Sequence, residues 1–167
     1  MMNKQEFIKL YRLSDAAPID PSSKTIKGAA FAEAISEFIN ENFRGIAEVE
    51  TDIKSNGSVM ICAEYTAFYF KTLLSFLHGR VYLNISIFED DDALRMSITS
   101  NEDMPLTFEE SNYLIKLARN AGMEIYPEDR QIHLSLRYSE AARHGVYAIS
   151  VADGKRVLLG KFCEIFF

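Results

Sequence analysis

The side chains best suited to chemistry are scattered along this chain. His78 ends a helical pattern, His133 alternates within a strand pattern and His144 precedes a glycine, so no two histidines have the short spacing typical of metal ligands. The acidic run 89–92 lacks the alternating oxygen ligands and the central glycine of a calcium loop, and it predicts a solvated hairpin tip. These side chains therefore predict no metal site.

Motifs for nucleophiles and phosphates are missing as well. Ser97, Ser100 and Ser111 lack the glycine-flanked context of a nucleophile elbow. The 8 glycines are spread along the chain, so none of them forms a phosphate-binding loop. We therefore expect no catalytic residue of these classes.

The composition narrows the classes of function that remain. At 167 residues the chain is predicted to form one domain, large enough to bury a core without disulfides or metals. A net charge of −6 without a basic run argues against nucleic acid and against an anionic membrane as partners. The chain shows neither a signal peptide nor an apolar run of the ~18 residues that a membrane span needs. Cys62 and Cys163 are interpreted as reduced core thiols, so we expect a cytoplasmic protein.

The elements that would position a site are organised around residues 60–101. Apolar residues at i, i+3 and i+4 spacing predict a helix over 64–78. Alternation of apolar and polar residues predicts strands over 81–88 and 94–99, joined as a hairpin. The polar turn 100–103 follows, and a ligand cleft is expected there.

Other elements flank this stretch. Residues 3–13 and 25–43 predict helices, and the prolines between them predict a loop. Thr107 and Glu110 have the spacing of a capping box, which opens a helix that Gly122 ends. Further hairpins are predicted for 49–53 with 59–63 around an Asn-Gly turn, for 123–126 with 131–138, and for 146–151 with 156–159, ahead of the aromatic tail 162–167.

Three of these segments follow one another in a suggestive order. Residues 61–77 are a strand and helix, 94–101 a strand ending at an asparagine, and 112–125 a helix followed by Ala-Gly-Met-Glu-Ile. Over residues 25–138 this order resembles the ATP-binding domain of sensor histidine kinases, which belongs to the GHKL, or Bergerat-fold, ATPases. The segments resemble that family's asparagine-box helix, its Asp-Asn-Gly strand and its Gly-Gly-Glu-Ile strand start. The resemblance implies an ATP and magnesium cleft and a role in bacterial signal transduction.

Other residue types occupy the positions where that family carries its chemistry. Thr72 and Phe76 stand where the family's asparagines hold magnesium, and a phenyl ring cannot ligate a hard cation. Ser100, or Thr99 in an ungapped alignment, replaces the aspartate that binds the adenine amino group. Asn101 alone matches the Asp-Asn-Gly motif, so it is the one cofactor-binding residue predicted here. The segment after it contains no glycine-rich lid.

These observations predict an α+β two-layer sandwich. A mixed sheet of about five strands should carry helices on one face, with a C-terminal β-hairpin extension. Residues 1–24 are assigned to an N-terminal helix and linker, 25–140 to a degenerate ATPase-type domain, and 141–167 to a hairpin and aromatic tail packed on that domain.

The leading functional hypothesis is a catalytically inactive relative of histidine kinase ATPase domains. It would act as a binding or regulatory module, without a cofactor. Its partner would be another protein, or a second copy bound through the C-terminal segment. Two alternatives stay open. One is a divergent nucleotide-binding enzyme that holds ATP and magnesium in a cleft rebuilt from His78, Arg80 and Asn101. The other is an unrelated α+β interaction domain.

Overall fold

The computed structural model describes residues 24–90, 92–128, 130–138 and 150–167. The predicted helix over 3–13 and the loop after it lie outside these residues. Within the described ranges the chain forms, in order, β1 (Lys24–Lys27), α2 (Gly28–Asn42), β2 (Ala47–Asp52), β3 (Ser58–Ile61), α3 (Ala63–Leu77), β4 (Leu83–Glu89), β5 (Ala93–Ser100), α4 (Phe108–Ala121), β6 (Glu124–Pro127), β7 (Gln131–Arg137) and α5 (Val151–Phe166).

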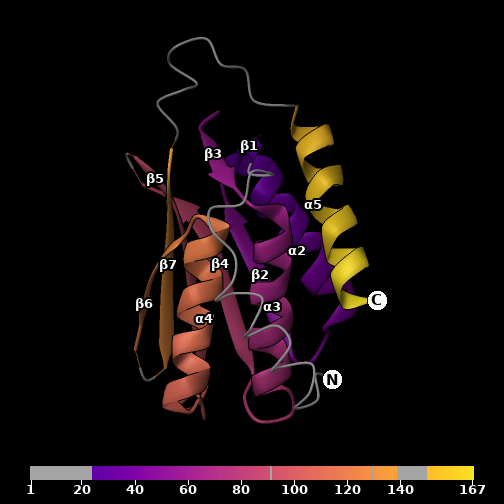
Figure 1. Cartoon of the computed structure of the whole chain (residues 1–167). Helices are drawn as coiled ribbons and strands as arrows, with labels where there is room; N and C mark the ends of the chain where they lie inside the picture. Colours follow the sequence, from indigo (N-terminus) through magenta and orange to yellow (C-terminus); the bar gives the residue numbers. More distant parts are fainter. Residues whose placement is uncertain (1–23, 91, 129, 139–149) are drawn as a thin grey trace.

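Five of the strands form one mixed sheet in the order β2-β4-β5-β7-β6. β2 runs parallel to β4, and the other neighbouring pairs are antiparallel. Helices α2, α3 and α4 lie on one face of this sheet (Figure 1). β1 and β3 form a separate antiparallel pair. The predicted sandwich with a mixed five-stranded sheet is therefore confirmed.

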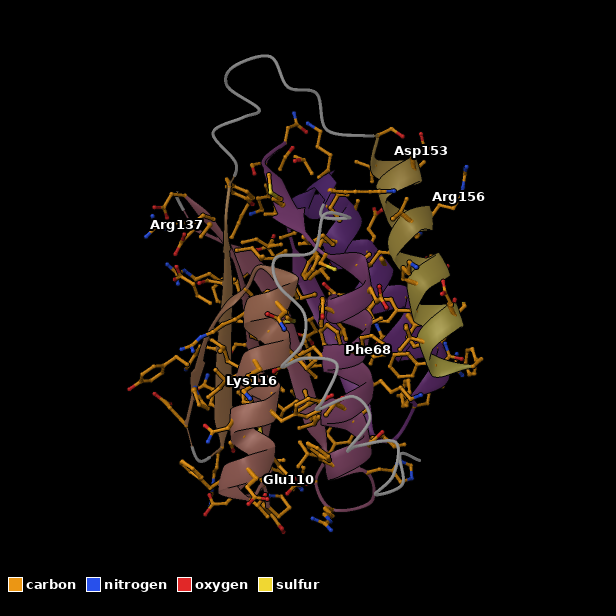
Figure 2. All side chains as sticks on the ribbon, in the orientation of Figure 1. Phe68, Glu110, Lys116, Arg137, Asp153 and Arg156 are labelled. Carbon is orange, nitrogen blue, oxygen red and sulfur yellow. The ribbon has the colours of Figure 1, made fainter. Side chains whose placement is uncertain are left out.

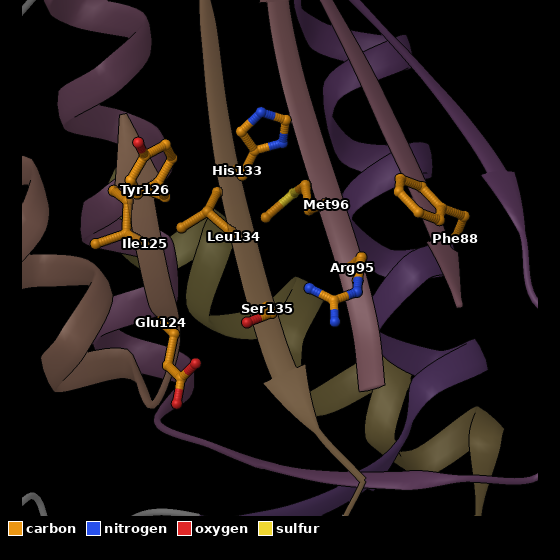
Figure 3. A pocket seen from close by; sticks show the side chains of 9 residues that line it. All are labelled: Phe88, Arg95, Met96, Glu124, Ile125, Tyr126, His133, Leu134 and Ser135. Carbon is orange, nitrogen blue, oxygen red and sulfur yellow. The ribbon is translucent and has the colours of Figure 1, made fainter. Parts of the chain in front are cut away.

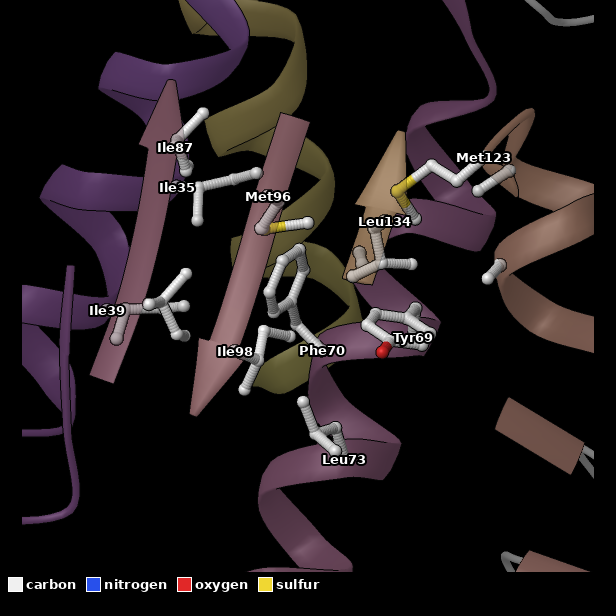
Figure 4. Packing of buried hydrophobic residues seen from close by; sticks show 14 of the residues in the cluster. Ile35, Ile39, Tyr69, Phe70, Leu73, Ile87, Met96, Ile98, Met123 and Leu134 are labelled. Atoms are coloured by element: carbon white, nitrogen blue, oxygen red, sulfur yellow. The ribbon is translucent and has the colours of Figure 1, made fainter. Parts of the chain in front are cut away.

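The core lies between the sheet and the helices. Along β4, Leu83, Ile85 and Ile87 are buried while Asn84 and Phe88 are exposed, because successive side chains of a strand point to opposite faces. Buried side chains from α2 and α3 cover these strands (Figure 4), among them Ile35, Ile39, Phe70 and Leu73.

The predicted hairpin of 49–53 with 59–63 is wrong. β2 pairs with β4, and β3 pairs with β1, so the two segments belong to different sheets. An Asn-Gly pair indicates only that the chain turns locally. Here Gly57 instead allows close packing against Gly28 and Tyr138. Its carbonyl accepts from the Gly28 amide at 2.9 Å, and a Cβ at Gly57 would lie 2.6 Å from the Tyr138 ring. Contacts distant in sequence therefore decided the strand pairing.

The outer edge of β2 is paired by a side chain. The carboxamide of Asn40 on α2 accepts from the Val49 amide at 2.9 Å and donates to the Val49 carbonyl at 3.1 Å. These are the two bonds that a neighbouring strand would make at this residue. Asn40 thus satisfies the backbone of β2 at the middle of its free edge.

The predicted C-terminal hairpin is also wrong, because residues 151–166 form helix α5. The Ser150 side chain caps this helix by accepting from the Asp153 amide at 3.2 Å. Gly154, Leu158 and Phe162 recur every four residues and are buried against α2 and α3. That helical period was present in the sequence, but alternating apolar residues obscured it.

The opposite side of α5 faces outward, where Asp153 and Arg156 project from the molecule (Figure 2). Both cysteines are free, but only Cys62 is buried, whereas Cys163 is exposed on α5. The prediction of two core thiols is therefore correct for Cys62 only. None of the described helices is long and apolar enough to cross a membrane.

Candidate functional site

The family resemblance places a nucleotide cleft between α3, the end of β5 and α4. In the structure β5 ends at Ser100 and α4 begins at Phe108, so residues 101–107 alone connect them. The capping box predicted at the start of α4 is confirmed. The Thr107 hydroxyl accepts from the Glu110 amide at 3.1 Å, and the Glu110 carboxylate accepts from the Thr107 amide at 2.9 Å. Residues 101–107 thus form a short connection that ends in a helix cap.

The facing sides of α3 and α4 are filled by their own side chains. Tyr69 and Thr72 on α3 and Tyr113 on α4 are all 0% exposed. Thr72 and Tyr113 interact through their hydroxyl groups. Burial raises the pKa of both tyrosines well above its ordinary value, so both stay neutral at physiological pH. The two helices therefore pack directly on each other beside Thr72.

The two positions that the resemblance assigns to magnesium carry uncharged side chains. The Thr72 hydroxyl is buried against Tyr113, and Phe76 is partly buried against the hydrophobic core. Among the described residues, no group of three or more His, Cys, Asp or Glu side chains is placed to hold a metal ion.

The polar turn after β5 is occupied by bonds within the chain. The Ser100 hydroxyl donates to the Glu102 carbonyl, and the Ser100 amide donates to the Arg130 carbonyl at 3.0 Å. The Asn101 side-chain oxygen accepts from the Tyr82 amide at 3.1 Å. Asn101 thereby fastens the open end of the β4–β5 hairpin. Its assignment to cofactor binding stays a prediction.

The two basic residues of the alternative cleft lie after the end of α3. His78 and Arg80 are both exposed. An Arg80 guanidinium nitrogen lies 3.5 Å from the Pro105 carbonyl, in the connection before α4. Arg80 and Asn101 therefore flank the same end of the molecule, while His133 lies on β7, with its Nε2 3.7 Å from a Glu128 carboxylate oxygen.

Sequence reasoning missed a second polar cluster, which is built on Glu89. One carboxylate oxygen accepts from the amides of Lys54 and Ser55 at 2.7 and 2.8 Å. The other accepts from the Ser55 hydroxyl at 2.5 Å and from the Tyr138 hydroxyl. The hairpin tip 89–92 was predicted to be solvated; Asp90 and Asp92 are exposed, whereas Glu89 is half-buried and hydrogen-bonded within the chain.

These bonds change the acidity of both ends of the cluster. Hydrogen bonds from the Ser55 and Tyr138 hydroxyls and from the two amides lower the pKa of Glu89 to about 2. Burial, together with the bond to Glu89, raises the pKa of Tyr138 to about 12. Glu89 is thus a carboxylate that ties the connection between β2 and β3 to the ends of β4 and β7, and no spacing in the sequence would have revealed its partners.

Comparison with solved structures identifies the fold. The chain superposes on the histidine kinase AdeS of Acinetobacter baumannii with a TM-score of 0.52 and 10% identity, covering 81% of this chain and 76% of that one. It superposes on the cytoplasmic segment of the histidine kinase QseC with a TM-score of 0.50 and 9% identity, covering 81% and 91%. No family model and no curated protein matches the sequence. The resemblance to histidine kinase catalytic domains is therefore confirmed at the level of the fold.

Proposed function

We propose that this chain is a histidine-kinase-like domain that does not use ATP and acts as a cytoplasmic binding or regulatory module. The observation that carries the proposal is Tyr113. Its ring and hydroxyl are fully buried on the side of α4 that faces α3, beside Thr72. A nucleotide bound there would have to displace a well-packed helix, which would cost the free energy of that packing.

The residue types around this position support the same conclusion. Neither Ser100 nor Thr99 carries a charge, so the adenine amino group would lose a carboxylate acceptor that contributes about 1.5–3 kcal/mol. Thr72 and Phe76 offer no carboxylate or carboxamide oxygen to a magnesium ion. Asn101, the one residue that matches the motif, already uses its side-chain oxygen on the Tyr82 amide.

The test is calorimetric titration of the protein with ATP and with ADP, each with magnesium. The losses above should place the dissociation constant over roughly 1 mM. Asn101→Ala and Arg80→Ala are the informative variants, and Asn84→Ala, at an exposed position on β4, is the matched control.

Micromolar binding that Asn101→Ala or Arg80→Ala abolishes and Asn84→Ala retains would overturn the proposal. That outcome would favour the divergent nucleotide-binding enzyme, with its cleft beside residues 101–107.

A further inference from the structure

The face of the five-stranded sheet opposite the helices is left open by the described residues. Most side chains on this face are polar, as expected for a face in contact with water. Two large exceptions are Phe88 on β4, 38% exposed, and Tyr126 on β6, 65% exposed. Neither contributes to the core, so core packing does not account for them.

The strand registers show that these two rings flank one hollow. One row of cross-strand neighbours runs Phe88, Arg95, Ser135 and Glu124. The adjacent row runs Ser86, Ser97, His133 and Tyr126. Ser135, the shortest side chain of the first row, stands between Arg95 and Glu124, and the surface sinks there between the two aromatic residues.

The resulting hollow measures about 410 Å³ (Figure 3). Ligand pockets commonly span roughly 300–1,000 Å³, so the space suits a small group or a few side chains of a partner. Phe88 and Tyr126 lie at opposite sides of it in the close view, with Arg95, His133 and Ser135 between them.

The charges around the hollow favour a cationic occupant. The Arg95 guanidinium donates to the Asp90 carboxylate, and Asp90, Asp92 and Glu124 all act to raise the pKa of Arg95. The positive charge of Arg95 is therefore compensated by neighbouring carboxylates of the chain itself.

The neighbouring strand β2 increases the negative charge. Its exposed acidic residues alternate with the buried Ala47 and Val49, which places Glu48, Glu50 and Asp52 on the open face. Asp52 is the cross-strand neighbour of Phe88. Only two Lys or Arg residues of the five strands, Arg95 and Arg137, lie on this face. Arg137 points away from the helices, near the top of the molecule in Figure 2.

We propose that the open face of the sheet, centred on the hollow between Phe88 and Tyr126, docks an arginine-bearing segment of a partner protein. A guanidinium stacks on aromatic rings and binds carboxylates through paired hydrogen bonds, so aromatic residues interleaved with acids suit it better than they suit lysine. The net charge of −6 would speed the encounter. This inference rests on the proposed binding function and specifies the chemistry of the partner.

The probe is a dye-labelled peptide of six arginines, followed by fluorescence anisotropy and by amide shifts in NMR spectra. Matched peptides of six lysines and six glutamates are the comparisons. The arginine peptide should bind more tightly than the lysine peptide and should shift amides of β5, β6 and β7 around the hollow.

The double variant Phe88→Ala/Tyr126→Ala should weaken the binding of the arginine peptide roughly three- to tenfold. Phe108→Ala, which removes an 81% exposed ring from the start of α4, should leave the binding unchanged.

Equal binding of the arginine and lysine peptides, unaffected by the double variant, would overturn the proposal, because a general attraction to an acidic protein would explain it. Self-association that the double variant abolishes, without peptide binding, would overturn it in favour of a second copy of this chain. Failure of the arginine peptide to bind would overturn this inference and would leave the nucleotide titration, which tests the proposed function, unaffected. Micromolar ATP binding would overturn the proposed function, but it would not change the amide shifts that the arginine peptide causes at the hollow.

Discussion

The carboxylate of Glu89 connects three segments that are distant in sequence. It stands at the end of β4 and receives hydrogen bonds from the segment after β2 and from Tyr138 after β7. Gly57 adds to the same contact, since the Tyr138 ring lies where its Cβ would be. The ionised form of Glu89 therefore stabilises the contact of the β2–β3 connection with the ends of β4 and β7.

Replacing Glu89 by glutamine should lower the free energy of unfolding at pH 7 by about 1–2 kcal/mol. Glutamine keeps one acceptor oxygen but loses the charge that strengthens all four bonds. Equilibrium denaturation with urea measures the difference. Asp90→Asn is the matched control, because Asp90 pairs with Arg95 at the surface, where ion pairs contribute little to stability.

The same prediction has a pH dependence. The folded protein holds the pKa of Glu89 near 2, below its ordinary value of 4.5. The stabilisation is therefore fully present above about pH 4.5 and is lost as the pH falls from 4.5 towards 2. Wild type and Glu89→Gln should converge in stability over that range. A difference that stays constant down to pH 2 would show that the charge of Glu89 is not its cause.

At the scale of elements, α4 depends on its first turn. Thr107→Ala should destabilise the protein by about 1 kcal/mol, because it removes the hydroxyl that accepts from the Glu110 amide. Thr107→Ser retains a hydroxyl and should recover most of the loss. Denaturant midpoints measure both. If alanine and serine shift the midpoint equally, the side-chain cap is not the stabilising feature.

Elements with strong local signals were predictable from the sequence. Helix α4 has a capping box at one end and Gly122 at the other, where a φ of +99° favours glycine. In the β4–β5 hairpin, apolar residues alternate with mostly polar ones along both strands. β2 and α5 were misjudged because their partners, β4 and α2, are supplied by tertiary packing rather than by neighbouring residues.

At the scale of the whole molecule, the candidate site could likewise be predicted from the sequence only in part. The residue types at Thr72, Phe76 and Ser100, and the prediction that they stand at the family's ligand positions, came from the sequence alone. The filling of the space beside Thr72 by Tyr113 required the packing of α4 on α3. The row of Phe88 and Arg95 on the open face required the register of two strands. The type of each residue can be read from the sequence, whereas which residues come into contact depends on the whole fold.

The pairing of Asn40 with Val49 has a consequence for many copies of this protein in one solution. A sheet edge with unpaired amides and carbonyls can recruit a strand from another molecule, and repeated recruitment leads to aggregates. By occupying the middle of that edge, Asn40 leaves an incoming strand no partners there. Asn40→Ala should therefore make the protein associate as its concentration rises, which sedimentation velocity would detect. Asn42→Ala, which removes only a bond to the Phe38 carbonyl, should stay as dispersed as the wild type. An Asn40→Ala protein that sediments like the wild type at every concentration would mean that other features keep this edge from growing into a shared sheet.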